Sequence, residues 1–452
     1  MHVRYARLRR SAALTAVAGA TVLAASLVAP ATSVAASTPT SGGMQPAIGV
    51  HPHYKSAGRV IHTAEGPLFG CQTTTPADCY GPDQIRAAYG VDQLAKQGLD
   101  GSGRTIVIVD AYSSPTITQD LAGFDSLFGL PDPHLQIIAP QGTTAFDAND
   151  PNQVGWAGEI TLDVEWAHAI APRAAIKLVL AKSSQDADIY AATRYAVLRN
   201  LGDVISQSFG EAEQCMDPKI LRAEHEVFTF AAWRRMTVLA SAGDDGAAQP
   251  SCDGSSYIQA ASTPASDPNV TGVGGTRLFA DGVTGAYQGE TVWNDAYGAG
   301  GGGYSTVFET PWYQRSLGLR SRGVPDVSYD AAVIGGVLTV WTVPGSSQGV
   351  YLFGGTSAGS PQWAGLVALA DQMHHGRVGE INPTLYAAAR NHRTYAADFH
   401  DVTQGNNAAL PVTAGFDAAP GWDAASGLGT PQADRLVPLL AGHDRERVES
   451  DR

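Results

Sequence analysis

The chain has 452 residues, of which 44% are hydrophobic and 16% are charged, a balance that is ordinary for a folded protein with a large core. Its formal net charge is −14 at pH 7. Such an excess of negative charge repels phosphate, so it argues against a nucleic-acid-binding function. We expect the acidic residues to form a solvated surface that loses charge, and with it self-repulsion, at low pH.

Residues 1–36 have the pattern of a secretory signal peptide. Arginines within residues 4–10 precede an apolar run over residues 11–28, and small residues follow up to Ala36. We expect cleavage after Ala36 and a secreted, extracellular protein with no stable membrane association. A retained membrane anchor is the alternative, but Pro30 and the small residues are more typical of a cleavage site.

Three further regions follow in the sequence. Residues 37–75 are rich in Ser, Thr, Pro, Gly and His without a sustained period, so we expect an extended lead-in. Residues 76–440 have the composition of one folded domain, and residues 441–452 form a charged tail that we expect to be disordered.

Short apolar runs alternate with helical stretches throughout the folded region. This alternation predicts an α/β domain in which helices cover both faces of a largely parallel central sheet. The predicted strands are Thr105–Val109, Ala175–Leu180, Val204–Ser206, Met236–Ala240, Val270–Val273 and Val337–Trp341. The predicted helices lie near residues 117–128, 157–170, 185–201, 218–234 and 358–373.

The chain has 4 cysteines, all of them after the predicted signal peptide. An even number in an exported chain favours two disulfides. Three pairings are possible, and we expect Cys71–Cys79, which closes a short loop, together with Cys215–Cys252. None of the cysteines has the spacing of a metal site.

A serine in a sharp turn is the first candidate for catalysis. Ser357 lies in the Gly-Thr-Ser-Ala segment at residues 355–358, which leads through Pro361 into an apolar helical stretch. Such a turn holds a hydroxyl at a helix N-terminus, where free backbone N–H groups can face a developing oxyanion. A serine nucleophile needs a base, yet no histidine in a His-Gly-Thr setting precedes Ser357.

Two carboxylates offer the missing base. Glu159 and Asp163 are four residues apart on a helical pattern, so their side chains lie on one face of the helix. Two close carboxylates cannot both ionise easily, so such a pair retains a proton into mildly acidic conditions. A solvated helix face is the alternative, but apolar residues crowd this pair in the sequence.

Further acidic residues follow in turns. Asp244 lies in a Gly-Asp-Asp-Gly loop directly after a predicted strand, where open α/β sheets place ligand-binding groups. Asp401 and Asp423 lie in turns near the C-terminus. Two carboxylates together with turn carbonyls suit a hard cation such as calcium, with ordinary Asp turns as the alternative.

Taken together and in order, these segments resemble the sedolisin family of serine-carboxyl peptidases, over roughly residues 76–440. Single motifs are weak, but the ordered set is specific. Its members are Glu159–Pro172 with Glu159 and Asp163, Ser206–Gly210, Gly243-Asp244, Pro264–Ser266, Gly274–Thr276, Gly301–Ser305, Pro325–Ser328, Gly355–Ala358 with Pro361, and the pair Asp401 and Gly421–Asp423.

The resemblance implies a subtilisin-like fold and an acid-acting serine-type endopeptidase that cleaves protein or peptide substrates, as a monomer. Ser357 would be the nucleophile, Glu159 the general base, and Asp163 the residue that orients Glu159. A protonated Asp244 would donate to the oxyanion beside the Ser357 N–H. One structural calcium ion would be held by the side chains of Asp401 and Asp423 and by the backbone oxygens of Val402, Ala419 and Gly421.

Family precursors commonly carry a substantial prodomain. Here only about 40 residues separate the predicted signal peptide from the Tyr80 region, which leaves the control of a zymogen open. A neutral subtilisin-type protease using Asp110 is one alternative, although His134, His168 and His225 lack the context of a catalytic histidine. An inactive relic that binds peptides is another, although all four catalytic positions are intact.

Overall fold

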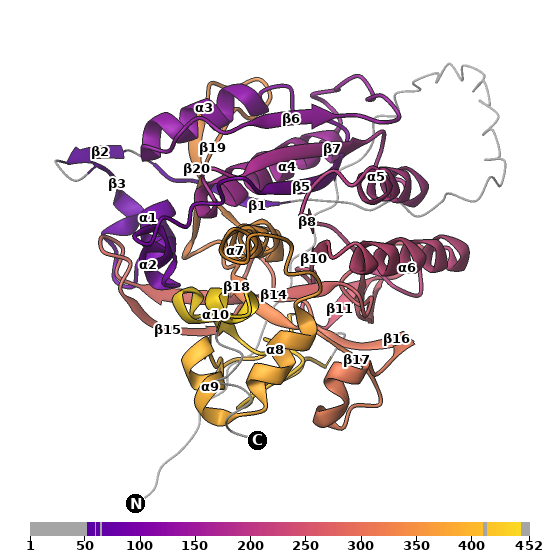
Figure 1. The fold of residues 1–452 in the computed structure, drawn as a ribbon. Coiled ribbons are helices and arrows are strands. Elements are labelled where there is room, and N and C mark those ends of the chain that lie inside the picture. Colours follow the sequence, from indigo (N-terminus) through magenta and orange to yellow (C-terminus); the bar gives the residue numbers. More distant parts are fainter. Residues whose placement is uncertain (1–51, 59, 64–65, 410–413, 444–452) are drawn as a thin grey trace, which may run out of the picture. The chain divides into compact units, whose positions relative to one another are not determined.

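The computed structural model describes residues 52–443 apart from residues 59, 64–65 and 410–413. The predicted signal peptide and most of the predicted tail lie outside the described residues. The central sheet has the strand order β15-β14-β10-β8-β5-β7-β6, with β18 also paired to β14 (Figure 1). Its strands are β5 (Thr105–Ala111), β6 (Leu135–Ile138), β7 (Ala175–Ala181), β8 (Val204–Gln207), β10 (Thr237–Ser241), β14 (Thr271–Ala280), β15 (Tyr287–Val292) and β18 (Val327–Asp330).

Every pairing in this sheet is parallel except that of β14 with β15. The predicted parallel sheet is therefore confirmed. The predicted strands at 105–109, 175–180, 204–206, 236–240 and 270–273 all belong to it, with bounds that differ by a few residues. Strands β6, β15 and β18 were not predicted, because their sequences are short or carry polar residues that interrupt an apolar run.

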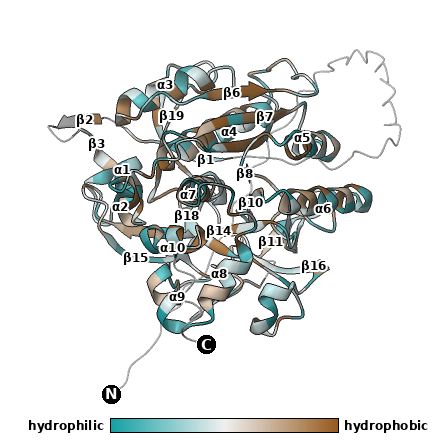
Figure 2. Ribbon diagram, in the orientation of Figure 1, coloured by the Kyte–Doolittle hydropathy of each residue, from teal (hydrophilic) through white to brown (hydrophobic). Residues whose placement is uncertain are grey.

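Helices cover both faces of the sheet (Figure 1). Helices α4 (Pro151–Ile170) and α7 (Gly359–Met373) pack on one face, and α5 (Asp186–Leu198) and α6 (Pro218–Trp233) pack on the other. Alternate residues of β5 point to opposite faces. Ile106 and Ile108 join the core beneath α4 and α7. Val107 and Val109 join the core beneath α5 and α6. Figure 2 shows these strands as largely hydrophobic.

A second sheet has the strand order β1-β20-β19-β4. Its strands are β1 (His53–Ser56), β4 (Cys79–Tyr80), β19 (Gly336–Trp341) and β20 (Gly349–Gly354). The expectation that residues 337–341 would join the parallel sheet is wrong, because β19 pairs antiparallel with β20. Only a short connection joins these two strands, and a parallel pairing would need a longer crossover.

The remaining elements surround these two sheets. The helices are α1 (Pro82–Ala88), α2 (Val91–Ala95), α3 (Ile117–Phe128), α8 (Asn382–Ala389), α9 (His392–Asp398), α10 (Ala433–Leu440) and the 3-10 turns η1 (Gly70–Gln72), η2 (Trp312–Leu317) and η3 (Thr356–Ala358). The small paired strands are β2 (Val60–Thr63) with β3 (Gly66–Phe69), β9 (Glu211–Ala212) with β13 (Ser262–Thr263), β11 (Ala248–Pro250) with β12 (Tyr257–Gln259), β16 (Gly303–Glu309) with β17 (Ser321–Val324), and β21 (Phe399–His400) with β22 (Thr430–Pro431).

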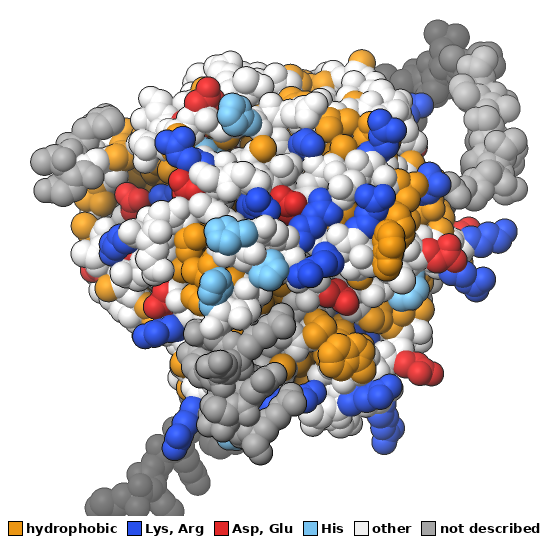
Figure 3. Space-filling view, in the orientation of Figure 1, with side chains coloured by type: hydrophobic (Ala, Val, Ile, Leu, Met, Phe, Trp, Pro, Cys, Tyr) orange, Lys and Arg blue, Asp and Glu red, His pale blue; other side chains and the backbone are white. Residues whose placement is uncertain are grey.

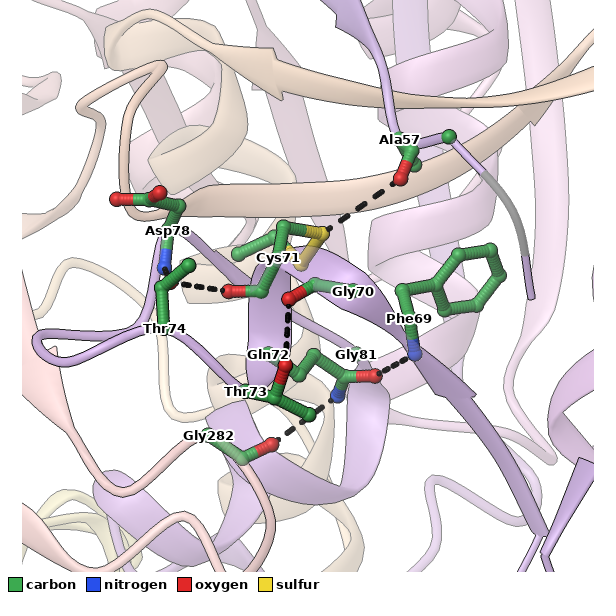
Figure 4. Close-up of a disulfide and its surroundings, with 12 residues drawn as sticks. Ala57, Phe69, Gly70, Cys71, Gln72, Thr73, Thr74, Asp78, Gly81 and Gly282 are labelled. Atoms are coloured by element: carbon green, nitrogen blue, oxygen red, sulfur yellow. Dashed lines mark hydrogen bonds between the residues drawn. A yellow bond between two sulfur atoms is a disulfide. The ribbon is translucent and has the colours of Figure 1, made fainter. Parts of the chain in front are cut away.

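Two disulfides join the cysteines as predicted, Cys71–Cys79 and Cys215–Cys252. The first fastens the end of the N-terminal strands to β4 (Figure 4). Around it, Phe69 N donates to Gln72 Oε1 at 2.9 Å, and Gln72 Nε2 donates to Gly282 O at 3.2 Å. The segment that precedes β4 is thus anchored to the rest of the fold by covalent and hydrogen bonds.

The surface of the described residues mixes both signs of charge. Figure 3 shows Lys and Arg side chains spread over one face among acidic ones, although the net charge of the chain is −14. The negative charge is therefore not uniform. Within the described part of the chain, none of the helices has the length and apolar character needed to span a bilayer.

Candidate active site

The candidate nucleophile lies in a tight turn between two regular elements. Strand β20 ends at Gly354, η3 contains Ser357, and α7 begins at Gly359. Gly355 has φ 114°, a left-handed conformation that favours glycine, and a Cβ there would lie 2.6 Å from Asp244 Oδ2. Ser357 is 8% exposed, and its Oγ lies 3.4 Å from Ser208 O. The turn thus presents a hydroxyl at the N-terminal end of a helix, as predicted.

Helix α4 carries the two predicted carboxylates. It begins after Asp150, whose side chain accepts a hydrogen bond from Asn152 N at 3.0 Å and caps the helix. Glu159 and Asp163 are both fully buried. Asp163 Oδ1 accepts a hydrogen bond from Ser208 Oγ at 2.9 Å, and Ser208 lies beside Ser357. The structure therefore brings Glu159, Asp163 and Ser357 together around the end of β8.

Burial raises the pKa of Glu159 well above its ordinary value, and the charges of Asp110 and Asp244 add to this shift. The Ser357 hydroxyl opposes the shift, although no hydrogen bond of standard geometry joins it to Glu159 among the described residues. Burial also raises the pKa of Asp163, and Asp110 and Glu159 raise it further. These carboxyls therefore hold protons at pH values where exposed carboxyls have lost them.

Asp110 is a member of this group that the sequence analysis did not assign to the sedolisin-like site. It lies near the end of β5, it is fully buried, and neither carboxyl oxygen has a hydrogen-bond partner among the described residues. Burial raises its pKa to about 8. The sequence feature that could have identified Asp110 is its position near the C-terminal end of a buried parallel strand, because ligand sites of open α/β sheets lie at that edge.

Asp244 approaches the nucleophile turn from the loop after β10. Its Oδ1 accepts hydrogen bonds from both Thr356 N and Thr356 Oγ1, each at 2.8 Å. Burial raises the pKa of Asp244, while the hydrogen bonds from Thr356 and the charge of His53 oppose this rise. A protonated Asp244 has its Oδ2 available as a donor next to the turn that carries Ser357.

The histidines considered for a subtilisin-type triad lie elsewhere. His168 Nε2 is 3.1 Å from Asp125 Oδ1, and His225 Nδ1 is 2.7 Å from Asp267 Oδ2. Among the residues that the structure describes, no histidine is hydrogen-bonded to Ser357. The titratable side chains that act on this site are the carboxyls of Glu159, Asp163, Asp110 and Asp244, together with His53, which lies opposite Gly354 and near Asp244.

The residues predicted to bind calcium lie in neighbouring turns. Asp401 Oδ1 accepts a hydrogen bond from Tyr395 Oη at 2.9 Å, and Asp423 Oδ2 accepts one from Ala419 N at 2.9 Å. Gly421 N donates to Asp401 Oδ2 at 3.1 Å, which brings Asp401 to the turn that carries Asp423, and burial followed by the charges of both carboxylates raises the pKa of Tyr395. The described ion pairs include neither aspartate, so no Lys or Arg neutralises them there.

This donor set consists of two carboxylates and backbone carbonyls, which suits an oxygen-preferring cation. Across the described residues there is no group of three or more Asp, Glu, His or Cys side chains that could hold a metal ion. A site here would therefore depend on the carbonyls of Val402, Ala419 and Gly421 for most of its ligands. The candidate ligand atoms are all oxygens, which is the ligand type that calcium prefers.

Comparison with known proteins defines the class of protein. The sequence model of the subtilase family matches residues 142–407, the part that contains all four predicted catalytic positions. The solved structure of *Pseudomonas* sedolisin, a serine-carboxyl proteinase complexed with two molecules of pseudo-iodotyrostatin, superposes with a TM-score of 0.70 at 28% identity. That match covers 82% of this chain and 99% of the sedolisin chain. The protein is thus a serine peptidase with the subtilisin-like fold.

Curated relatives narrow the family. Kumamolisin of *Bacillus* sp. (strain MN-32) is 34% identical over 402 residues, which cover 86% of this chain and 68% of kumamolisin. Sedolisin of *Pseudomonas* sp. (strain 101) is also 34% identical, over 74% of this chain and 57% of that protein. The chain belongs to the sedolisin family. A tripeptidyl-peptidase, sed4 of *Aspergillus fumigatus*, is 28% identical over 84% of this chain and 70% of its own length.

Proposed function

We propose that this protein is a secreted, acid-acting serine endopeptidase with Ser357 as nucleophile, Glu159 as general base, Asp163 as the residue that orients the base, and Asp244 as oxyanion donor. The observation that carries the proposal is the carboxylic setting of Ser357. Ser208 Oγ donates to Asp163 Oδ1 at 2.9 Å and lies 3.4 Å from Ser357 O, and the Ser357 hydroxyl influences the pKa of Glu159.

The reaction begins when Ser357 Oγ attacks the carbonyl carbon of the scissile peptide bond and gives its proton to Glu159. The oxygen of the tetrahedral intermediate then accepts hydrogen bonds from the Ser357 N–H and from protonated Asp244. As the C–N bond breaks, Glu159 returns the proton to the leaving amine. Water, deprotonated by Glu159, attacks the acyl-enzyme; the bond between the acyl carbon and Ser357 Oγ then breaks, Glu159 returns the proton to Ser357 Oγ, and the acid product leaves.

The preference for acid follows from two requirements. Asp244 must be protonated to donate, and at least one member of the Glu159–Asp163 pair must be ionised to accept the seryl proton. Burial raises the pKa of each of these groups, so ionising all of them at neutral pH is unfavourable. Below neutral pH, Glu159, Asp163 and Asp244 together can carry one negative charge and keep their remaining protons, which meets both requirements.

A structural calcium ion held by Asp401, Asp423 and the carbonyls of Val402, Ala419 and Gly421 belongs to the same proposal. When bound, the ion neutralises the exposed carboxylate of Asp401 and the buried carboxylate of Asp423, and it fixes the turns that carry them. The C-terminal turns lie against the residue before β18, since Leu428 N donates to Asp326 O at 2.8 Å. The proposed calcium ion therefore stabilises the fold and takes no part in the reaction.

The test is cleavage of a long peptide, the oxidised insulin B chain, from about pH 3 to pH 8 by the wild-type protein and by Ser357→Ala. We expect activity that peaks well below neutral pH and is absent in Ser357→Ala. A neutral or alkaline optimum would contradict the carboxylic mechanism. Product masses separate the two modes of action, because internal cuts indicate an endopeptidase and serial release of N-terminal tripeptides indicates a tripeptidyl-peptidase.

A further inference from the structure

The ends of two neighbouring helices expose large apolar side chains. Helix α5 ends at Leu198, which is 41% exposed, and α6 ends at Trp233, which is 75% exposed. Trp233 is the most exposed of the large hydrophobic side chains among the described residues. The Phe230 ring stacks on it, with the ring centroids 5.4 Å apart. Isolated exposed apolar residues are common, but a contiguous apolar surface is typical of an interaction site.

Arginines flank these apolar side chains. Arg199 follows Leu198 in the sequence, and two further arginines follow Trp233. The Arg234 guanidinium lies 4.9 Å from the centre of the Phe230 ring. Residues 195–201 and 227–236 contain no Asp or Glu, so this surface is basic although the chain has a net charge of −14. We call it the helix-end patch, which consists of Leu198, Arg199, Phe230, Trp233, Arg234 and Arg235.

A further arginine joins the two helix ends. Arg377 Nη1 donates to Asn200 Oδ1 at 2.7 Å and to Arg234 O at 3.3 Å, so the ends of α5 and α6 lie side by side. Arg377 Nε also pairs with Asp203 Oδ1 at 3.0 Å, which neutralises the carboxylate beside the patch. Figure 3 shows hydrophobic side chains between Lys and Arg side chains in the region where α5 and α6 lie in Figure 1.

The helix-end patch lies at the edge of the sheet opposite the candidate active site. Helix α5 ends shortly before β8 begins at Val204, and α6 ends shortly before β10 begins at Thr237. Ser208 and Asp244 follow the other ends of these two strands. A partner bound at the patch therefore leaves Ser357 accessible from solution.

Interaction with the helix dipoles accounts for only part of the patch. A cation near a helix C-terminus is stabilising, which gives the arginines at the ends of α5 and α6 a role in folding. This effect does not require an exposed indole ring at the same place. The combination of Trp233 with Leu198 and the arginines therefore indicates a partner that offers both negative charge and an apolar phase.

A bilayer with anionic lipids has both properties. Tryptophan rings favour the level of the lipid headgroups, and apolar side chains of interfacial helices enter the boundary with the acyl chains. Arginines near the surface are attracted by anionic headgroups. A soluble anionic polymer would match the charges of the patch but not its apolar side chains.

We propose that the helix-end patch is a reversible docking surface for bilayers that contain anionic lipids. A docked molecule turns its candidate active site toward the solution, so the bilayer concentrates the protein without blocking access to Ser357. Arginine keeps its charge at acid pH, so docking persists where acidic side chains lose theirs. This binding does not depend on the peptidase function proposed above.

The test is co-sedimentation of the secreted Ser357→Ala protein with vesicles of phosphatidylglycerol and phosphatidylcholine in equal parts. We expect binding to these vesicles that weakens as salt is added, and little binding to vesicles of phosphatidylcholine alone. The triple variant Arg199→Gln/Arg234→Gln/Arg235→Gln should bind at least about tenfold more weakly, because each arginine contributes to the attraction. Trp233→Ala should bind severalfold more weakly and leave the salt dependence unchanged.

Matched control variants remove the same groups elsewhere. The triple variant Lys96→Gln/Arg315→Gln/Arg393→Gln removes the same number of positive charges from α2, η2 and α9. Trp312→Ala removes another exposed tryptophan, which is 59% exposed on η2. Both should bind vesicles as the parent protein does, and thermal melts verify that every variant is folded. No binding to anionic vesicles, or an equal loss in patch and control variants, overturns the proposal. Binding to immobilised heparin but not to vesicles also overturns it, because the partner would then be a soluble polymer.

Discussion

Thr356, the residue before the candidate nucleophile, donates two hydrogen bonds of 2.8 Å to a single oxygen of Asp244, one from its backbone N–H and one from its hydroxyl. This arrangement commits Oδ1 as an acceptor and leaves Oδ2 to carry a proton. One residue therefore links the turn that carries the candidate nucleophile to Asp244, the proposed oxyanion donor. The orientation of Asp244 is coupled directly to the conformation of this turn.

This coupling predicts how Asp244 can be replaced. In Asp244→Asn, the amide oxygen can still accept from Thr356, and the amide NH2 is a donor at every pH. We expect the alkaline limb of the pH–kcat/KM profile to move upward while some activity remains. Asp244→Ala removes the donor, and we expect kcat to fall about 100- to 1,000-fold. An alkaline limb that is the same in Asp244→Asn and the wild type would assign that limb to another group.

Glu159→Gln separates catalysis from stability. Glutamine resembles the protonated glutamic acid that burial favours at this position. We therefore expect the melting temperature at neutral pH to stay the same or rise, while kcat falls by at least about 1,000-fold, because the amide cannot accept the seryl proton. Ser357→Ala is the matched control for loss of activity in a folded protein. A Glu159→Gln variant that retains most of its activity would exclude Glu159 as the base.

Asp110→Asn tests the contribution of the additional carboxyl to the pH dependence of stability. The pKa of Asp110 in the folded protein is about 8, above the value of an unfolded aspartic acid. The folded state thus keeps the Asp110 proton between these two values, so the contribution of Asp110 to stability is greatest at acid pH and falls as the pH rises toward 8. In denaturant titrations from about pH 4 to pH 8, we expect Asp110→Asn to lessen this decline by up to about 1.4 kcal/mol per pH unit.

Chelation tests the proposed calcium site. If calcium bridges Asp401 and Asp423, EDTA should lower the melting temperature by several degrees, and added calcium but not magnesium should restore it. Asp423→Asn should reduce the response of the melting temperature to calcium. Asp434→Asn, a control variant on α10, should respond to calcium as the wild type does. Identical melting curves with EDTA and with calcium, for wild type and variant alike, would argue against a structural calcium ion.

Much of the fold could be predicted from local sequence patterns. The buried strands β5, β7 and β8 contain short apolar runs, and α3 and α7 follow helical patterns close to their observed bounds. The pairing of β19 with β20 could not be predicted in this way, because an apolar run does not indicate its partner. Strand β1 was described only as part of an extended lead-in, since its polar residues show no alternation and its pairing with β20 is a long-range contact.

The sequence by itself determined the kinds of group at this site: a serine in a Gly-Thr-Ser-Ala turn, two carboxyls at helical spacing, and an aspartate in a loop after a strand. These follow from local geometry, because a helix sets residues four apart on one face and a turn exposes its hydroxyl. Only the tertiary structure brought Asp110 to Glu159 and Asp163, and His53 to the end of β20. Proximity between residues far apart in sequence, and the burial that raises their pKa, arises from packing.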